Sequence, residues 1–183
     1  MPVQRYEWAA PGDLVHLDTK KLGRIHGIGK RFGGPRGARH RGWDLVHVAI
    51  DDHSRLAYVE VLGDEHATTA AAFLDRALGF YAGYGIAVKR IMTDNGSPYV
   101  SRVVGEALAT HEIRHIRTRP YTPRTNAKAE AMVKFLINRW AYLWPYESSE
   151  ERTQALGGII ETYNYRRPHG GLNGACPIDR VRQ

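Results

Sequence analysis

The order of the expected elements predicts an α/β protein, with a mixed five-stranded sheet flanked by helices. Three β-rich runs come first, and strands and helices alternate after them. A turn signal of only three residues separates the second run from the third, which predicts an antiparallel hairpin. Antiparallel strands followed by alternating strands and helices are typical of a mixed central sheet with helices packed on it.

Five short runs are expected to form the strands, because each is rich in apolar or β-branched residues. They span residues 14–18, 43–51, 55–62, 89–93 and 114–118. Asp18 is expected to close the first strand, and Asp94 closes the fourth where the turn signal Asp94-Asn95-Gly96 begins. If the first and fourth strands are neighbours, these two carboxylates lie side by side.

Four helices are expected from apolar periodicity and from end signals. The first spans residues 67–84, the second follows the capping residue Ser101 and runs to about residue 112, and the third spans residues 125–143. Ser148 and Glu151 form a capping-box pattern that opens the fourth helix. The tail from Arg166 is rich in Pro and Gly and is expected to be irregular.

The composition is that of an ordinary globular protein of one domain, with 183 residues, 43% hydrophobic and 25% charged. The formal net charge is +7 and the pI is about 9.7, which favours a polyanionic partner such as nucleic acid. The single cysteine, Cys176, excludes an internal disulfide and a cysteine-based zinc site. No run is apolar and long enough for a signal peptide or a membrane span, so we expect a cytoplasmic protein without a membrane partner.

Basic residues gather in two stretches that contain no acidic residue. Residues 20–42 hold eight Lys or Arg and seven Gly, and residues 113–129 hold five Lys or Arg. Either stretch is equally well explained as a solvated surface or as a DNA-facing loop. The side chains that we expect to contact DNA are Lys20, Lys30, Arg31, Arg119, Arg124, Lys128 and Lys134.

Three carboxylates stand where a protein core would not place them. Asp18 and Asp94 end two strands, and Glu130 lies in the first turns of the third helix, beside its apolar stripe. Each alone has an ordinary explanation as a turn residue, a helix cap or a partner of the helix dipole. Together they form an all-oxygen ligand set, which selects hard ions such as Mg²⁺. Two such ions, roughly 3.5–4 Å apart, activate a nucleophile and stabilise a leaving oxygen in phosphodiester chemistry.

The surrounding residues resemble a known family. The words are LDTK at residues 17–20, TDNGSPY at residues 93–99, PYTPRTNAKAE at residues 120–130 and YNYRRPH at residues 163–169. Thirty-five residues separate Asp94 from Glu130. This pattern is similar to the D,D-35-E signature of retroviral-type integrases and insertion-sequence transposases, and it covers nearly the whole chain.

The resemblance implies a ribonuclease H-like fold with Asp18, Asp94 and Glu130 as the metal-binding catalytic triad. It implies Mg²⁺ or Mn²⁺ as the cofactor, two ions in number, with water as the nucleophile for cutting and the freed 3′-hydroxyl as the nucleophile for joining. The implied partners are DNA, as element ends and target duplex, and at least a second copy of the chain. The implied location is the cytoplasm of a prokaryote, in association with the nucleoid.

Three neighbours of the triad are expected to shape the site. Asn95 and Gly96 form the loop after Asp94, and Asn126 is expected to cap the helix that carries Glu130. Two positions depart from the family pattern, because Ala127 and Ala131 replace a common Gly and a common Arg. The resemblance also implies that residues 1–183 form a single catalytic core, without the N-terminal helix-turn-helix region of relatives.

Two other functions remain open at this point. A ribonuclease H-type nuclease would share the fold, although the 35-residue spacing argues against it. A catalytically idle DNA-binding fragment would use the basic residues 20–42, and its binding would weaken steeply with salt. The adjacent Asp51 and Asp52 are interpreted as hairpin residues rather than as a second metal site.

Overall fold

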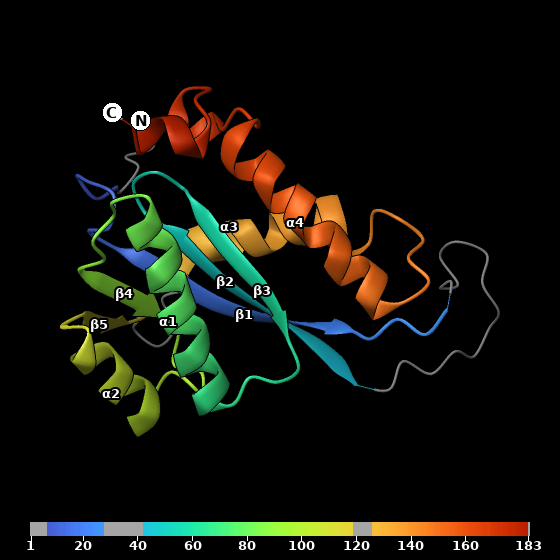
Figure 1. Cartoon of the computed structure of the whole chain (residues 1–183), viewed down its shortest axis with the longest axis horizontal. Coiled ribbons are helices and arrows are strands. Elements are labelled where there is room, and N and C mark those ends of the chain that lie inside the picture. The colour runs from blue at the N-terminus through green and yellow to red at the C-terminus, as the bar shows by residue number, and fades with distance from the viewer. Residues whose placement is uncertain (1–6, 28–41, 119–125, 183) are drawn as a thin grey trace.

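The computed structural model describes residues 7–27, 42–118 and 126–182 (Figure 1). Its centre is a five-stranded sheet in the order β3-β2-β1-β4-β5. β1 pairs antiparallel with β2 and parallel with β4, so the sheet is mixed, as predicted. The strands are β1 (Val15–Gly23), β2 (Trp43–Asp51), β3 (Ala57–Leu62), β4 (Arg90–Thr93) and β5 (Arg114–Arg117).

Helices cover both faces of this sheet. The four α-helices are α1 (Ala67–Gly83), α2 (Arg102–Thr110), α3 (Ala127–Leu136) and α4 (Ser149–Tyr165). In the part of the chain that the structure describes, no helix combines the length and apolarity that crossing a lipid bilayer requires.

Alternation along the strands divides the apolar core into two clusters. Val15 and Leu17 of β1 pack with α1 and α2 on one face. Leu22 of β1 and Val48 of β2 pack with α3 and α4 on the other face. Successive side chains of a strand point to opposite faces, so even-numbered residues of β1 face α3. Asp18 therefore lies on the α3 face of the sheet.

β1 is longer than the sequence predicts, because it continues past Asp18 to Gly23. Its last five residues pair with the beginning of β2, from Thr19 opposite His47 to Gly23 opposite Trp43. The polar residues of this extension are tolerated because much of the ribbon faces solvent. The expectation that Asp18 closes the strand is therefore wrong, since Asp18 lies near the middle of β1.

The third helix also differs from the expected single helix over residues 125–143. α3 ends at Leu136 and continues as a π-helical turn, η3 (Ile137–Ala141). Within this turn Trp140 is fully buried, and its indole Nε1 donates a hydrogen bond to the carbonyl oxygen of Arg152 at 2.6 Å. The turn thus joins α3 to α4.

The C-terminal part is more ordered than its composition predicts. Ser148 caps α4 by accepting a hydrogen bond from the Glu151 amide, as expected. After α4 the tail forms two 3₁₀ turns, η4 (Gly170–Leu172) and η5 (Pro177–Arg180), rather than irregular chain. Asn164 of α4 binds both the amide and the carbonyl of Ala57. This contact fastens α4 to the start of the edge strand β3.

Candidate active site

Strand register brings Asp18 and Asp94 together. β1 and β4 are parallel, with Val15 opposite Ile91 and His16 opposite Met92. Continuing this register two residues further sets Asp18 opposite Asp94, which directly follows β4. Neighbouring strands lie about 4.8 Å apart, so the two residues occupy adjacent positions where β4 ends beside the middle of β1.

Glu130 approaches the same corner from α3. It lies in the first turn of that helix, on the sheet face to which Asp18 also points. Asp94 and Glu130 are exposed, and Asp18 is half-buried. Burial raises the pKa of Asp18 to about 6, and the negative charges of Asp94 and Glu130 add to this rise. The Thr19 amide and Lys20 oppose it. The three expected residues therefore share one electrostatic neighbourhood.

The carboxylates do not converge on one point. Among the described residues, no three His, Cys, Asp or Glu side chains are close enough together to hold a metal ion. One oxygen of Asp18 accepts from the Thr19 amide, and one oxygen of Asp94 accepts from the Gly96 amide, both at 2.8 Å. The donor chemistry nevertheless suits a hard divalent cation, because a cation would relieve the mutual repulsion of carboxylates.

The loop after Asp94 is held by local contacts. The Asn95 side chain donates to the carbonyl oxygen of Thr118 at 2.8 Å, which ties the loop to the end of β5. A Cβ at Gly96 would lie 2.9 Å from Oδ1 of Asp94, so this position favours glycine. The Tyr99 hydroxyl lies 2.9 Å from Oγ1 of Thr19. The loop is thus attached to both β5 and β1.

Asn126 occupies the N-cap position of α3, but its side chain makes no capping hydrogen bond. Its amide nitrogen donates to the carbonyl oxygen of Leu17, and its oxygen lies 3.0 Å from Nδ1 of His16. The expectation of a capping side chain is therefore wrong. Both ends of this buried amide are used by β1, which leaves the helix amides to other partners.

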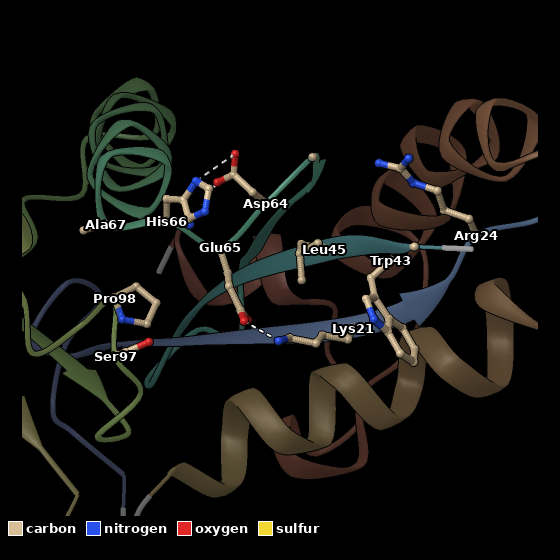
Figure 2. A pocket seen from close by; sticks show the side chains of 12 residues that line it. Lys21, Arg24, Trp43, Leu45, Asp64, Glu65, His66, Ala67, Ser97 and Pro98 are labelled. Carbon is tan, nitrogen blue, oxygen red and sulfur yellow. Dashed lines mark hydrogen bonds and ion pairs between the residues drawn. The ribbon is translucent and has the colours of Figure 1, made fainter. Parts of the chain in front are cut away.

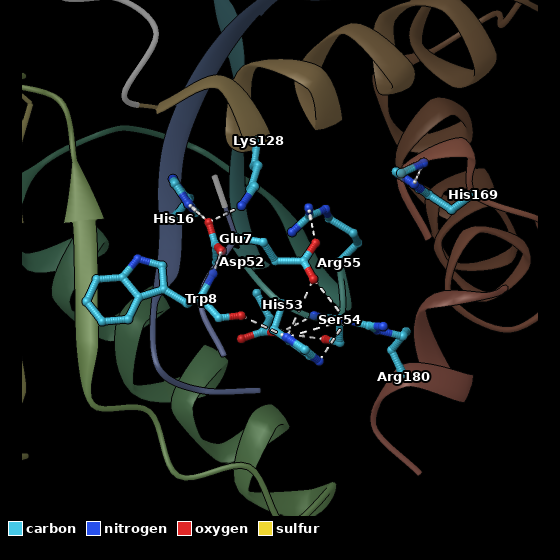
Figure 3. Close-up of polar contacts among 12 residues, drawn as sticks. Glu7, Trp8, His16, Asp52, His53, Ser54, Arg55, Lys128, His169 and Arg180 are labelled. Carbon is cyan, nitrogen blue, oxygen red and sulfur yellow. Dashed lines mark hydrogen bonds and ion pairs between the residues drawn. The ribbon is translucent and has the colours of Figure 1, made fainter. Parts of the chain in front are cut away.

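Lys128 points into the protein rather than along its surface. Its ammonium forms an ion pair with Asp52, which also lies 2.8 Å from Nε2 of His16 (Figure 3). Burial alone would raise the pKa of Asp52, but hydrogen bonds from His16 and Lys128 lower it to about 2. The ammonium that we expected at DNA is thus partnered by an interior carboxylate.

Asp51 and Asp52 are fully buried at the β2–β3 hairpin. Asp51 accepts hydrogen bonds from the Gly12 amide and from both the amide and hydroxyl of Ser54. Asp52 also accepts from the Trp8 amide at 2.7 Å. Both carboxylates are therefore occupied in holding the hairpin and the N-terminal segment.

The remaining residues expected at DNA fall into two groups. Lys20 and Lys134 are exposed. Lys20 shares a strand face with Asp18, and Lys134 lies one helical turn beyond Glu130. Lys30, Arg31, Arg119 and Arg124 lie outside the described residues.

A cavity of about 560 Å³ lies on the other face of the sheet (Figure 2). Lys21, Trp43 and Leu45 line it from the β1–β2 ribbon, and Ser97 and Pro98 line it from the loop after Asp94. Lys21 is paired with Glu65, from the connection into α1. None of the three candidate carboxylates lines this cavity, so it is separate from their site.

The partners of Asn126 and Lys128 were missed by the sequence interpretation. His16 is a polar residue within an otherwise apolar strand start, and it is buried. That interruption of the apolar run, two residues before Asp18, is the sequence feature that could have indicated a buried polar contact. Asp52 was identified but interpreted only as a hairpin residue.

Comparisons with known proteins agree with this fold. A family model described as the integrase core domain matches residues 9–123, and a second of the same description matches residues 111–177. An uncharacterized protein of Caenorhabditis elegans, K02A2.6, is 27% identical over 170 residues, covering 93% of this chain. An uncharacterized protein of the insertion element IS136 from Agrobacterium fabrum is 28% identical over 91 residues, covering 50% of this chain. The chain spans 11% and 47% of the lengths of these two relatives.

Solved structures show the same arrangement. The catalytic core domain of BIV integrase superposes with a TM-score of 0.63 at 20% identity, covering 92% of each chain. A chain of the simian T-cell lymphotropic virus intasome, solved in complex with a PP2A regulatory subunit, gives a TM-score of 0.70 at 18% identity, covering 97% of this chain and 57% of that one. The first family model alone matches more than half of the 183 residues. The chain therefore belongs to the integrase core domain family, whose members form ribonuclease H-like integrase and transposase cores.

Proposed function

We propose that this protein catalyses polynucleotidyl transfer on DNA, in which a strand is cut at an element end and its 3′-hydroxyl is joined to a target. The observation that carries the proposal is the strand register that sets Asp18 opposite Asp94, on the sheet face that α3 covers. The negative charges of Asp94 and Glu130 act on Asp18, so the three carboxylates share one electrostatic neighbourhood. Such a set is suited to phosphodiester chemistry.

Asp18, Asp94 and Glu130 would hold Mg²⁺ or Mn²⁺, as two ions. When bound, the ions would supply Lewis acidity that favours deprotonation of the attacking water or hydroxyl and stabilises the leaving oxygen. The carboxylates of the protein would fix where the ions bind. The Asn95 contact holds the loop after Asp94, and the Gly96 amide fixes the orientation of the Asp94 carboxylate. Lys20 and Lys134 are exposed near this corner and would contact the phosphates of the strand.

We further propose that residues 1–183 form one catalytic core and that the DNA partners are element ends and a target duplex. The similarity to a protein of insertion element IS136 supports the ends of a mobile DNA element as one of these partners. The solved relative in an intasome supports assembly of at least two copies on DNA. The net charge of +7 favours a polyanionic substrate.

A strand-transfer assay with a pre-cut DNA end and Mg²⁺ tests the proposal. We expect Asp94→Asn and Glu130→Gln each to reduce joining at least a thousandfold (~4 kcal/mol in the barrier), because each removes a metal ligand. Circular dichroism should show an unchanged fold, since both side chains are exposed. Glu150→Gln is the matched control, because Glu150 is also an exposed first-turn glutamate, in α4.

The same assay separates the other two functions. Variants that join and nick DNA like the parent would remove the triad assignment. Cleavage restricted to the RNA strand of an RNA–DNA hybrid would indicate a ribonuclease H-type nuclease instead. Salt-sensitive DNA binding without any Mg²⁺-dependent cleavage would indicate a DNA-binding fragment.

A further inference from the structure

Four polar side chains, together with the backbone at the start of α3, form a closed ring of contacts between β1, the β2–β3 hairpin and α3. The ring consists of His16, Asp52, Asn126 and Lys128, and we call it the anchoring ring. His16 contacts Asn126 through Nδ1 and Asp52 through Nε2. Asp52 contacts Lys128 (Figure 3). The backbone at the start of α3 closes the ring from Lys128 to Asn126. His16, Asp52 and Asn126 are each less than 5% exposed, so solvent competes little for these contacts.

Asn126 attaches the start of α3 to one defined point of β1. Its amide spans two consecutive strand residues, with 3.0 Å to the ring of His16 and 3.0 Å to the carbonyl oxygen of Leu17. Nδ2 of Asn126 donates to the carbonyl oxygen of Leu17, and its Oδ1 faces Nδ1 of His16. This attachment immediately precedes Asp18 in the sequence.

Glu130 and Asp18 lie at matching distances from this point. Glu130 is one helical turn beyond Asn126, on the same helix face and about 6 Å along the axis. Asp18 is two residues beyond His16, about 6.6 Å along the strand. α3 and β1 run in the same direction (Figure 1). Lys20 and Leu22, further along β1, line one small cavity with Val133 of α3 and Ile137 of η3, which lie further along the helix than Glu130. Glu130 and Asp18 therefore lie at similar distances, in the same direction, from the point where Asn126 contacts β1.

Apolar packing and hydrogen bonds both hold α3 on the sheet. Ala129, Met132, Val133 and Leu136 hold α3 on the sheet through the core cluster. The hydrophobic effect is non-directional, so these contacts define the position of the first turn less sharply than hydrogen bonds do. Directional hydrogen bonds at residues 126 and 128 fix both the axial position and the rotation of the first turn.

We propose that the anchoring ring positions Glu130 relative to Asp18, so that its four residues are positioning residues of the metal site. The inference rests on the proposed function, since it assigns the ring to the carboxylates that would hold the ions. Lys128 then acts through Asp52 and the helix, rather than through DNA. Small errors in ligand position matter, because Mg²⁺ requires near-ideal octahedral geometry.

Mn²⁺ binding, measured by electron paramagnetic resonance of the intact chain, tests the ring apart from activity. We expect Asn126→Ala to weaken Mn²⁺ binding about tenfold, as loss of supporting contacts around metal ligands commonly does. Asn164→Ala is the matched control, because Asn164 is a buried asparagine whose amide also makes two hydrogen bonds from a helix to a strand. It should lose comparable stability and keep its Mn²⁺ affinity.

Lys128→Met provides a second variant with an opposite electrostatic expectation. Removing a positive charge near the carboxylates would by itself strengthen Mn²⁺ binding. A positioning role predicts weaker binding instead, together with a strand-transfer rate that falls more with Mg²⁺ than with Mn²⁺. The KM for DNA should stay at the parent value.

Mn²⁺ binding by the parent and by Glu130→Gln separates a failure of the positioning role from a failure of the proposed function. If the parent binds Mn²⁺, Glu130→Gln does not, and folded Asn126→Ala and Lys128→Met both bind like the parent, the positioning role is overturned while the proposed function stands. A parent that binds no Mn²⁺ would overturn both. Should Asn126→Ala not fold, the Lys128→Met result decides alone.

Discussion

Gly96 illustrates how a single residue controls the candidate site. Its amide donates to Oδ1 of Asp94, and a Cβ there would approach that same oxygen to 2.9 Å. The clash involves the end of a flexible side chain, so relief should come from movement of the Asp94 carboxylate rather than of the backbone. The absence of a side chain at Gly96 thus leaves room for the Asp94 carboxylate in its observed orientation.

We expect Gly96→Ala to reduce Mg²⁺-dependent strand transfer roughly tenfold, because the Asp94 carboxylate must move by about half an ångström to make room for the added Cβ. Denaturant unfolding should show a loss below about 1 kcal/mol. Gly79→Ala is the control, since a Cβ at Gly79 in α1 meets nothing within 4 Å. That variant should keep full activity and gain up to about 1 kcal/mol of stability. Parent-like joining by Gly96→Ala would show that the direction of Asp94 is not fixed by this glycine.

At the scale of elements, the junction between α3 and α4 depends on a buried polar contact. Trp140 in η3 is fully buried and donates to the carbonyl oxygen of Arg152 in α4. The π-helical turn allows this placement by shifting the residues that follow Leu136. The indole therefore contributes both apolar burial and a directional bond between two helices.

We expect Trp140→Phe to destabilise the protein by about 1–2 kcal/mol, because it leaves the Arg152 carbonyl without its indole donor and reduces buried volume. Urea unfolding monitored by circular dichroism measures this change. Trp144→Phe should change stability by less than about 0.5 kcal/mol, since Trp144 is 59% exposed. Equal stabilities for the two variants would contradict a structural role for the Trp140 bond.

At the scale of the whole molecule, the positions of the exposed lysines determine how DNA would approach Asp18 and Glu130. Lys20 and Lys134 are exposed and come from different elements, β1 and α3. Both lie toward the face of the sheet that carries Asp18 and Glu130. Phosphate contacts by separate cations should contribute independently to affinity.

We expect Lys20→Ala and Lys134→Ala each to lower the slope of log K against log salt for duplex DNA by about 1, because each removes one phosphate contact. Fluorescence anisotropy at several salt concentrations measures the slope. Arg102→Ala is the control, since Arg102 is exposed on α2 and paired with Glu106. An unchanged slope for both lysine variants would place DNA elsewhere on the molecule.

Local sequence patterns were sufficient for the order of the five strands and the four α-helices, although not for the π-helical turn after α3 or the 3₁₀ turns of the tail. β2 spans the predicted residues 43–51, and Ser101 and Ser148 cap their helices as expected. These features depend on alternation, apolar spacing and capping, which are properties of neighbouring residues. The D,D-35-E resemblance predicted the three carboxylates from their spacing, and the parallel pairing of β1 with β4 places Asp18 and Asp94 at neighbouring strand positions.

Only the tertiary structure decided how these carboxylates are supported. The Asn126–His16 contact spans 110 residues of sequence, the His16–Asp52 contact 36 and the Lys128–Asp52 contact 76. No local periodicity encodes such pairings, because they depend on the relative placement of a strand, a hairpin and a helix. The extension of β1 beyond Asp18 likewise depends on partners supplied by β2. The sequence by itself determined which residues carry the candidate chemistry, and the packing of α3 on the sheet determined which residues hold them in register.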